Sequence, residues 1–430
     1  MINMFIQMSP KLFIQLATIY LLLVMMSAAH AVAPLTLEDG TEISFDIQAA
    51  SGNKLLLWIP SEAGPQASDA RIAAGLAKKG IEVWRLDPVE ARFLPVTQSS
   101  MDRIPAGDVA AIMEYAIAKT HKQIFIAGTG RAAIPILRGM QQWQYNHSDQ
   151  SRLGGVMLLS PKFFVETPDP GEAARLMPIV TQTNLPLYLL QPKQSPWYWK
   201  LPITKQALER SGSSVLLQTV DKVRDRFYFR PDATDYERQQ SEKLATWLAD
   251  AASLLAAEPK QYRRSFRQTK AKPEVTVGKK DHVLQAYQGI SIPPELRLKN
   301  LRGKVIDLKS YRGKVVLVNF WASWCPPCVH EMPSMQRLQD KYRKKGFVIL
   351  GVNMADDKQT IANFLKTKVK VSFPILLDSD GAALRRWQVF AFPTSYVIDK
   401  KGSIRYALFG SLEWDTAETM AKINGLLKEK

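Results

Sequence analysis

Residues 314–328 read KVVLVNFWASWCPPC, and this stretch decides the fold of the region around it. Its first seven residues form an apolar, β-branched run that predicts a buried strand. Two prolines follow Cys325, and proline fits the first turn of a helix, where its missing N–H would have no partner. The pattern therefore predicts a strand, then a turn, then a helix whose first turn contains the segment from Cys325 to Cys328.

The two cysteines predict thiol chemistry. They are the only cysteines among 430 residues, so a disulfide-stapled scaffold and a four-thiolate zinc site are excluded. The positive end of a helix lowers the pKa of a thiol placed there. We therefore expect Cys325 to attack as the nucleophile and Cys328, one turn into the helix, to resolve the mixed disulfide.

Other uses of this pair fit the sequence less well. A c-type haem site needs histidine directly after the second cysteine, and that residue is Val329. A zinc site needs more ligands, for which only His330 and His282 are candidates. A structural disulfide is the remaining alternative, but Cys-x-x-Cys at a helix start favours a redox centre. No metal and no cofactor are expected.

The stretch from Val318 to Cys328 resembles the active-site strand and helix of thioredoxin-like proteins, above all the TlpA/ResA-like thiol–disulfide oxidoreductases. The other matching stretches also stand in the family's order: residues 298–305 come before this stretch, and residues 347–353, 373–378 and 392–394 come after it. The resemblance implies a thioredoxin-like domain over residues 284–430. It also implies an enzyme that reduces protein disulfides and is recharged by a membrane thiol carrier.

The resemblance also assigns residues that face the cysteines. Pro393 occupies the position of the family's cis-proline, and the backbone of Phe392 then offers substrate a strand-like edge. Trp324 and Thr394 are placed on the substrate side with Phe392. Pro393 is therefore expected in the catalytic site, and the other three residues in the substrate site.

Glu331 is the expected proton carrier. It lies six residues after Cys325 and matches the active-site glutamate of ResA-like proteins, so it should tune the thiol pKa values and relay a proton. Asn319 stands where cytosolic thioredoxins carry a buried aspartate, so that route is closed. The alternative is a solvent-exposed helix glutamate.

Residues 32–257 alternate between apolar, strand-like runs and helical stretches, which predicts an α/β domain with a doubly wound, mostly parallel sheet. The expected strands are Leu55–Ile59, Ile81–Leu86, Gln123–Ala127, Gly155–Leu159, Leu187–Leu190 and Ser214–Val220. The expected helices are Asp69–Lys79, Asp108–Lys119, Arg131–Gln142, Thr204–Ser211 and Tyr236–Ala256. This order resembles the α/β-hydrolase fold.

The hydrolase triad is missing from this resemblance. Gly130 stands where a nucleophile elbow carries serine, and no histidine occurs between His147 and His282. The late loop offers Arg224 and Arg226 instead, and the segment after the fifth strand, QPKQ at 191–194, has no acid. We expect a domain that hydrolyses no ester and binds a partner or positions the redox domain.

The turn after the third strand allows two other interpretations. Residues 128–133 also fit a dinucleotide fingerprint, but the next strand ends at Leu159-Ser160-Pro161 without the required acid. The bare helix start beside Arg131 could hold a small anion. Thr129 and Ser160, the nearby hydroxyls, are expected to be structural.

The remaining segments concern location. Residues 1–31 contain Lys11, an apolar run over 12–26 and Ala-x-Ala before Val32, which predicts a signal peptide and a periplasmic protein. The alternative is an uncleaved inner-membrane anchor. Residues 258–283 form a basic linker, expected to be a tether or a weak contact to an anionic membrane surface. The net charge of +17 suggests an anionic surface or partner, and we expect no nucleic-acid partner.

Two function classes follow from these observations. The first is an exported thiol–disulfide oxidoreductase that reduces protein disulfides through Cys325 and Cys328. The second is a binding protein whose hydrolase-like domain does the work and whose redox centre is regulatory. Replacing Cys325 with serine separates them, because only the first class loses its function.

Overall fold

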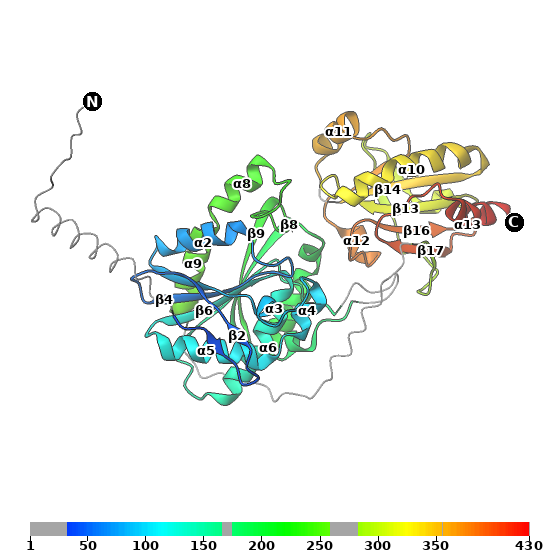
Figure 1. Ribbon diagram of the computed structural model, residues 1–430. Helices are drawn as coiled ribbons and strands as arrows, with labels where there is room; N and C mark the ends of the chain where they lie inside the picture. The colour runs from blue at the N-terminus through cyan, green and yellow to red at the C-terminus, as the bar shows by residue number, and fades with distance from the viewer. Residues whose placement is uncertain (1–31, 166–173, 259–282, 355, 430) are drawn as a thin grey trace, which may run out of the picture.

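The computed structural model describes residues 32–165, 174–258, 283–354 and 356–429. These residues form two units, each with its own sheet (Figure 1). We call residues 32–258 the N-terminal unit and residues 283–429 the C-terminal unit. The predicted signal segment and all but the two end residues of the predicted linker lie outside the described residues, so those predictions and the exact domain limits stay predictions.

The N-terminal unit is built on a seven-stranded sheet in the order β3-β5-β4-β6-β7-β8-β9. All neighbouring strands are parallel except β3, which is antiparallel to β5. The strands are β3 (Asp46–Gln48), β4 (Lys54–Ile59), β5 (Ile81–Arg85), β6 (Gln123–Thr129), β7 (Leu153–Leu159), β8 (Pro186–Gln194) and β9 (Ser214–Arg224). A short hairpin of β1 (Leu35–Thr36) and β2 (Glu42–Ile43) precedes them.

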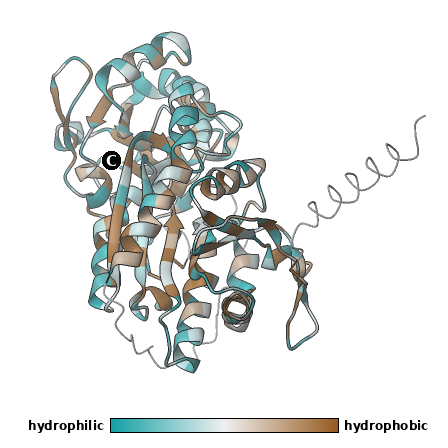
Figure 2. Cartoon of the chain, turned by 90° about the vertical axis from the view of Figure 1, so that its left-hand side faces the viewer, coloured by the Kyte–Doolittle hydropathy of each residue, from teal (hydrophilic) through white to brown (hydrophobic). Residues whose placement is uncertain are grey.

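Helices cover both faces of this sheet, which confirms the predicted doubly wound arrangement. Alternate residues of β4 enter two different cores: Leu55 and Leu57 pack with α5 and α6, and Leu56 packs with α2 and α9. Figure 2 shows the strands largely brown and the outer helices with teal faces, as this alternation requires. The helices are α2 (Ala67–Ala77), α3 (Pro88–Ala91), α4 (Gln98–Arg103), α5 (Ala106–Lys119), α6 (Ala133–Asn146), α7 (Leu201–Arg210), α8 (Asp235–Glu242) and α9 (Leu244–Ala257).

One expected helix is two helices. The stretch predicted as a single helix over 236–256 is interrupted at Lys243, between α8 and α9. The break falls where a polar segment meets an apolar one: α8 buries only Glu237 and Gln240, whereas α9 buries a stripe of leucine and alanine against the sheet. The two segments therefore pack against different surroundings, which the sequence pattern had not separated.

The C-terminal unit contains a six-stranded sheet in the order β10-β17-β16-β13-β14-β15. The strands β13, β14 and β15 are parallel, and β16 runs antiparallel to β13. Their bounds are β10 (Gln285–Ala286), β13 (Val315–Trp321), β14 (Phe347–Met354), β15 (Ile375–Asp378), β16 (Thr394–Ile398) and β17 (Ile404–Phe409). The predicted opening hairpin is β11 (Arg297–Lys299) paired with β12 (Val305–Asp307). This is the thioredoxin-like fold that the sequence predicted.

Four helices complete the C-terminal unit: α10 (Pro326–Tyr342), α11 (Lys358–Thr367), α12 (Ala382–Arg386) and α13 (Ala417–Lys428). Residues from α10, α11 and α13 pack on one face of β13 with Val315 and Leu317. Residues from α12 pack on the other face with Val316 and Val318. The helix that carries the cysteines is therefore fixed along its length by a buried core.

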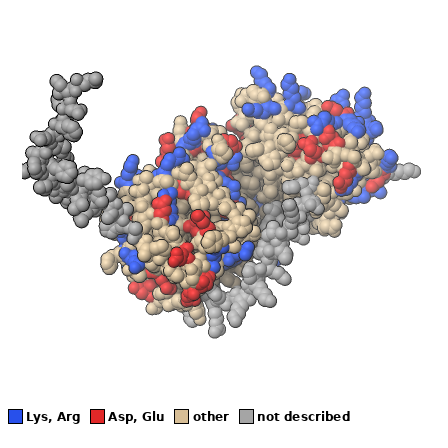
Figure 3. All heavy atoms as spheres, in the orientation of Figure 1, with Lys and Arg blue, Asp and Glu red and all other residues tan. Residues whose placement is uncertain are grey.

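Within the described residues, no helix is both long and apolar enough to span a bilayer. On the face that Figure 3 shows, basic and acidic side chains are interspersed on both units. On this face, both units therefore have positive as well as negative charges.

Candidate active site

Cys325 lies where β13 gives way to α10. It is the N-cap residue of α10, Pro326 and Pro327 occupy the first helical turn, and its Sγ accepts a hydrogen bond from the Cys328 N–H at 3.3 Å. Cys325 and Cys328 form a disulfide with their Cα atoms 5.4 Å apart. Cys325 is 5% exposed and Cys328 is 0% exposed, so Cys325 is the sulfur that another molecule can reach.

Pro393 lies across the sheet from the cysteine turn. In the antiparallel pair of β13 and β16, Thr394 is opposite Phe320, so the residue before Thr394 is brought beside the end of β13. The Phe392–Pro393 peptide bond is cis, as the resemblance implied. The rings of Trp324 and Phe392 meet edge to face with centroids 5.7 Å apart, so these two residues form one aromatic wall beside the disulfide.

Thr394 has a different position from the one expected. Its side chain is fully buried, and its hydroxyl donates a hydrogen bond to the Ala391 carbonyl at 2.6 Å. It was expected to face substrate. Because the hydroxyl is used within its own loop, Thr394 instead fixes the segment that carries Phe392 and Pro393.

Glu331 is a buried carboxyl group rather than an exposed helix residue. It is 1% exposed. Its Oε1 accepts a hydrogen bond from Asn319 Nδ2 at 2.8 Å, and its Oε2 accepts from Trp414 Nε1 at 3.0 Å and from the Leu412 N–H at 3.2 Å. Burial raises the pKa of Glu331 to about 7, although these hydrogen bonds oppose the change.

Two of these partners were missed by the sequence analysis. In the sequence, Asn319 indicates only that the buried aspartate of cytosolic thioredoxins is absent, yet its side chain donates hydrogen bonds to Glu331 and to Ser395 Oγ, the latter at 2.9 Å. Trp414 lies 83 residues after Glu331, and nothing in its local sequence marks it. Contacts of this kind arise from packing, so single-sequence patterns carry no signal for them.

Asp356 is a further residue that the sequence did not indicate. Its Oδ2 accepts hydrogen bonds from the Ser323 N–H at 2.8 Å and from Asn353 Nδ2 at 2.9 Å. Burial raises its pKa. Because Ser323 lies two residues before Cys325, Asp356 fixes the turn that presents the reactive sulfur.

The zinc alternative gains no support from the described residues. His330 is exposed, and its nearest acidic partner is Glu413 at 3.7 Å. The described residues contain no group of three or more His, Cys, Asp or Glu side chains that could hold a metal ion. His282 lies outside the described residues.

The turn after β6 in the N-terminal unit, which the sequence analysis compares with a nucleophile elbow, has glycine at residue 130. Gly130 has a φ of +60°, and a Cβ atom built there would lie 2.5 Å from Glu62 Oε2. The carboxylate of Glu62 therefore occupies the space into which a serine side chain would project.

Glu62 is held there by three donors. It accepts hydrogen bonds from the Arg131 N–H at 2.9 Å, from Lys162 Nζ at 2.5 Å and from an Arg226 guanidinium nitrogen at 2.6 Å. Burial raises the pKa of Glu62, but the charge of Lys162 and the Arg131 hydrogen bond outweigh it and lower the pKa to about 2. The carboxylate thus adds stability above about pH 4.5 that is lost as the pH falls towards 2.

This arrangement corrects the expectation of a free anion site at the helix start. In a hydrolase, the N–H that follows the nucleophile belongs to the oxyanion hole. Here that N–H donates to Glu62, and the Arg131 side chain is fully buried against Asp102, with N–O distances of 2.6 and 2.8 Å. The anion that occupies this position is the protein's own carboxylate.

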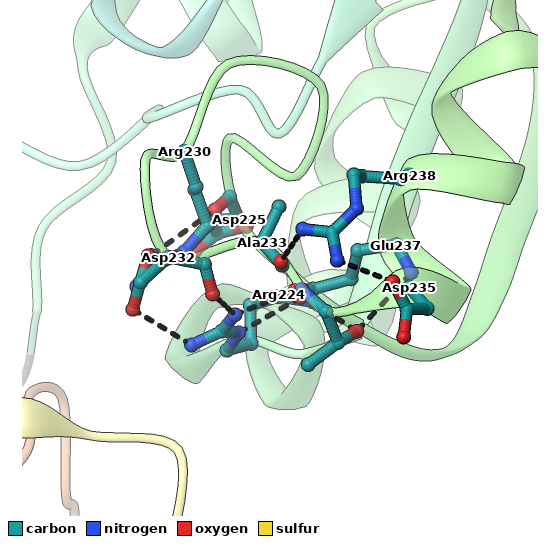
Figure 4. A network of polar contacts seen from close by, with 9 residues as sticks. Arg224, Asp225, Arg230, Asp232, Ala233, Asp235, Glu237 and Arg238 are labelled. Atoms are coloured by element: carbon teal, nitrogen blue, oxygen red, sulfur yellow. Dashed lines mark hydrogen bonds and ion pairs between the residues drawn. The ribbon is translucent and has the colours of Figure 1, made fainter.

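The loop after β9 is fixed by ion pairs (Figure 4). Arg224 bonds Glu237 at 2.5 Å and Asp232 at 3.0 Å, and Arg230 also pairs with Asp232 at 2.9 Å. These contacts tie the end of β9 to α8. The loop between them directs Arg226 to Glu62.

Glu331 provides a test of the redox site. An unfolded chain releases this proton near pH 4.5, whereas the folded protein keeps it to about pH 7. The free energy of unfolding should therefore fall by about 3 kcal/mol as the pH rises between these values. In Glu331→Gln, which keeps the shape and carries no charge, this fall should be absent and the pKa of the reduced Cys325 thiol should decrease.

Urea unfolding across this pH range and a thiol titration measure both effects. Glu418→Gln is the matched control, because Glu418 is an exposed carboxylate elsewhere in the same unit. Identical pH profiles for wild type and Glu331→Gln would show that Glu331 does not titrate near neutrality.

Known proteins resemble this chain in its C-terminal unit. The AhpC/TSA family matches residues 292–407. Thiol–disulfide oxidoreductase ResA of Geobacillus kaustophilus is 36% identical over 128 residues, which are 30% of this chain and 73% of the relative. ResA of Geobacillus thermodenitrificans is 37% identical over 122 residues, 28% of this chain and 70% of the relative. The crystal structure of StoA from Bacillus subtilis has 29% identity and a TM-score of 0.27, covering 31% of this chain and 98% of StoA.

Proposed function

The chain belongs, through its C-terminal unit, to the ResA-type thiol–disulfide oxidoreductases, and we propose that it is an exported reductase of protein disulfides. The observation that carries this proposal is the Cys325–Cys328 pair at the start of α10, with the buried carboxyl of Glu331 one turn further along the same helix.

The reaction begins with the reduced dithiol. The Cys325 thiolate attacks one sulfur of the substrate disulfide, a mixed disulfide forms, and the first substrate thiol leaves. Cys328 then attacks the Sγ of Cys325, and the second substrate thiol leaves. The substrate gains two electrons and two protons, and the protein ends with the Cys325–Cys328 bond. Full burial of Cys328 supports this order, because only Cys325 is accessible to a substrate.

Glu331 supplies the acid–base function in this proposal. Cys328 must lose its proton before it attacks, and Glu331 lies one helical turn away from it. A pKa of about 7 allows this carboxyl to accept and release a proton near neutral pH. Asn319, Trp414 and the Leu412 N–H then act as positioning groups that hold the carboxyl in place.

The cellular location of the protein and the reducing direction of its reaction are part of the same proposal. Lys11 and the apolar run after it support export to the periplasm, with retention as an inner-membrane anchor as the alternative. In an oxidising compartment a reductase must be recharged, and a membrane thiol carrier is the proposed electron donor. The basic segment of residues 258–283 is proposed to be a tether, in weak contact with an anionic membrane surface at most.

For the N-terminal unit we propose a role without hydrolysis. Gly130 provides no nucleophile, Glu62 fills the anion position, and Arg226 takes the place of a base. The unit is proposed to be an α/β-hydrolase-like scaffold that binds or positions. Thr129, which bonds Tyr228 at 2.7 Å, and Ser160 are proposed as structural residues of this scaffold.

The reduction potential of the Cys325–Cys328 pair tests the reducing direction. A reductase should equilibrate with glutathione or dithiothreitol at a potential nearer to the about −270 mV of thioredoxin than to the about −120 mV of the strongest oxidants. The fraction of oxidised protein, measured by alkylation at a series of redox buffers, gives this value. A potential close to that of the strong oxidants would mean that the protein forms disulfides.

A further inference from the structure

The two units contact each other through aromatic and cationic side chains. Lys200 Nζ lies 3.8 Å from the ring centroid of Phe390, and the rings of Phe164 and Phe390 meet edge to face at 6.4 Å. The guanidinium of Arg385 lies 5.5 Å from the ring of Trp199. Lys200 and Phe390 are each only 6% exposed, so the contact excludes solvent.

This contact lies next to the substrate side of the redox site. Phe390 comes two residues before Phe392, whose ring packs on Trp324 beside Cys325. Phe164 and Lys200 therefore contact the segment that leads to Pro393, and Trp199 contacts Arg385 of the preceding helix, α12.

The loop after β14 borders the other side of the cysteine turn. Asp356 in this loop accepts a hydrogen bond from the Ser323 N–H at 2.8 Å.

The strand directions explain why these regions meet. Asp357 follows β14, Arg385 follows β15 and Cys325 follows β13, and the carboxyl ends of parallel strands lie at one edge of a sheet. Phe164 follows β7 and Trp199 follows β8, at the carboxyl edge of the other sheet. Figure 1 shows α12 on the side of the C-terminal unit nearest to the N-terminal unit.

We infer that Phe164, Trp199 and Lys200 are specificity-determining residues of the redox site: through them the N-terminal unit forms a second wall beside Cys325. A disulfide reaches Cys325 only between the two units. The matching substrates are disulfides on protruding loops or unfolded segments, and those on the flat face of a folded domain are excluded. The redox part of this inference rests on the proposed function.

The structure offers a matched pair of variants that displaces the wall. A Cβ atom at Gly381 would lie 2.5 Å from the Trp199 ring, and one at Gly313 would meet nothing within 4 Å. Both glycines have positive φ, +64° and +85°, which asparagine tolerates better than other residues. Gly381→Asn should displace Trp199. Gly313→Asn places asparagine in a similar left-handed backbone conformation but causes no steric clash. Arg385→Ala and Arg386→Ala form a second pair, because only Arg385 lies over Trp199.

Accessibility is measured without reference to catalysis. The reduced wild-type protein and each variant are alkylated at Cys325 with N-ethylmaleimide and with a polyethylene-glycol maleimide. The ratio of the two alkylation rates is then compared between the variants and the wild type. Gly381→Asn and Arg385→Ala should raise the relative rate of the bulky reagent several-fold, and the two controls should leave it unchanged. The rate with insulin relative to oxidised glutathione should rise in the same two variants.

The outcomes separate this inference from the proposed function. An unchanged alkylation ratio in the double variant Gly381→Asn/Arg385→Ala would show that the N-terminal unit does not restrict access to Cys325. It would not affect the proposed reductase function. A fall in the insulin rate would also overturn the inferred wall, because the N-terminal unit would then recruit folded substrates. A wild-type protein that reduces neither disulfide would overturn the proposed function, whereas the alkylation ratio would still decide whether the wall exists.

Discussion

Cys325→Ser should abolish disulfide exchange, with the rate of insulin reduction falling by about 10³-fold or more, because serine cannot form the thiolate that attacks. Cys328→Ser should have a different consequence. Attack by Cys325 proceeds, but no thiol is present to resolve the product, so a mixed disulfide with substrate should accumulate. Non-reducing gel electrophoresis and mass spectrometry of the adduct measure this directly.

The control for this pair is His330→Ala, on the exposed side of the same helix, which should keep the wild-type rate. Stable adducts that form with Cys325→Ser and not with Cys328→Ser would reverse the two roles. Retention of the protein's biological function in Cys325→Ser would instead favour the alternative, in which the N-terminal unit does the work and the redox centre is regulatory.

Gly130→Ser should destabilise the N-terminal unit strongly and produce no esterase. The left-handed backbone at this position costs a non-glycine residue about 1–2 kcal/mol, and crowding against the Glu62 carboxylate adds about 1–3 kcal/mol. A serine hydroxyl without a base is also a weak nucleophile. Denaturant unfolding gives the loss of stability, and hydrolysis of p-nitrophenyl acetate gives the activity.

Gly40→Ser is the matched control for this substitution. Gly40 has a φ of +82° with nothing within 4 Å of its Cβ position, so it reports the backbone cost alone. The esterase assay uses the oxidised protein, in which Cys325 cannot react. Turnover by the unmodified protein that disappears in Ser160→Ala or Thr129→Ala would show that the elbow lies elsewhere and that the chain has two activities.

The redox site was predictable where its chemistry is local in the sequence. The strand over 315–321, the turn and the helix that starts at Pro326 follow from one apolar run and the residues after it. The position of both cysteines at that helix start therefore needed no tertiary information. The boundary between α8 and α9 could not be predicted from the sequence, because both segments favour helix and only their packing distinguishes them.

The environment of each functional carboxyl group came only from the tertiary structure. Glu331 could be placed on the helix of the cysteines, yet its burial and its pKa depend on Trp414 and Leu412, more than 80 residues away. Likewise the sequence showed that residue 130 lacks a hydroxyl, but not that Glu62, 69 residues before Arg131, fills the space.

What the sequence by itself determined is the chemistry of the redox site: a dithiol at a helix start and a glutamate one turn beyond it. For the other unit it showed glycine at residue 130, where the resemblance to hydrolases requires a nucleophile. These features depend on residue identity and short spacings, which strand and helix periodicity convert directly into neighbours. The tertiary structure decided which carboxyl group is neutral, which is ionised, and what stands beside Cys325. Those properties depend on desolvation and on contacts between distant segments, and such contacts form only when the two sheets and their helices have packed.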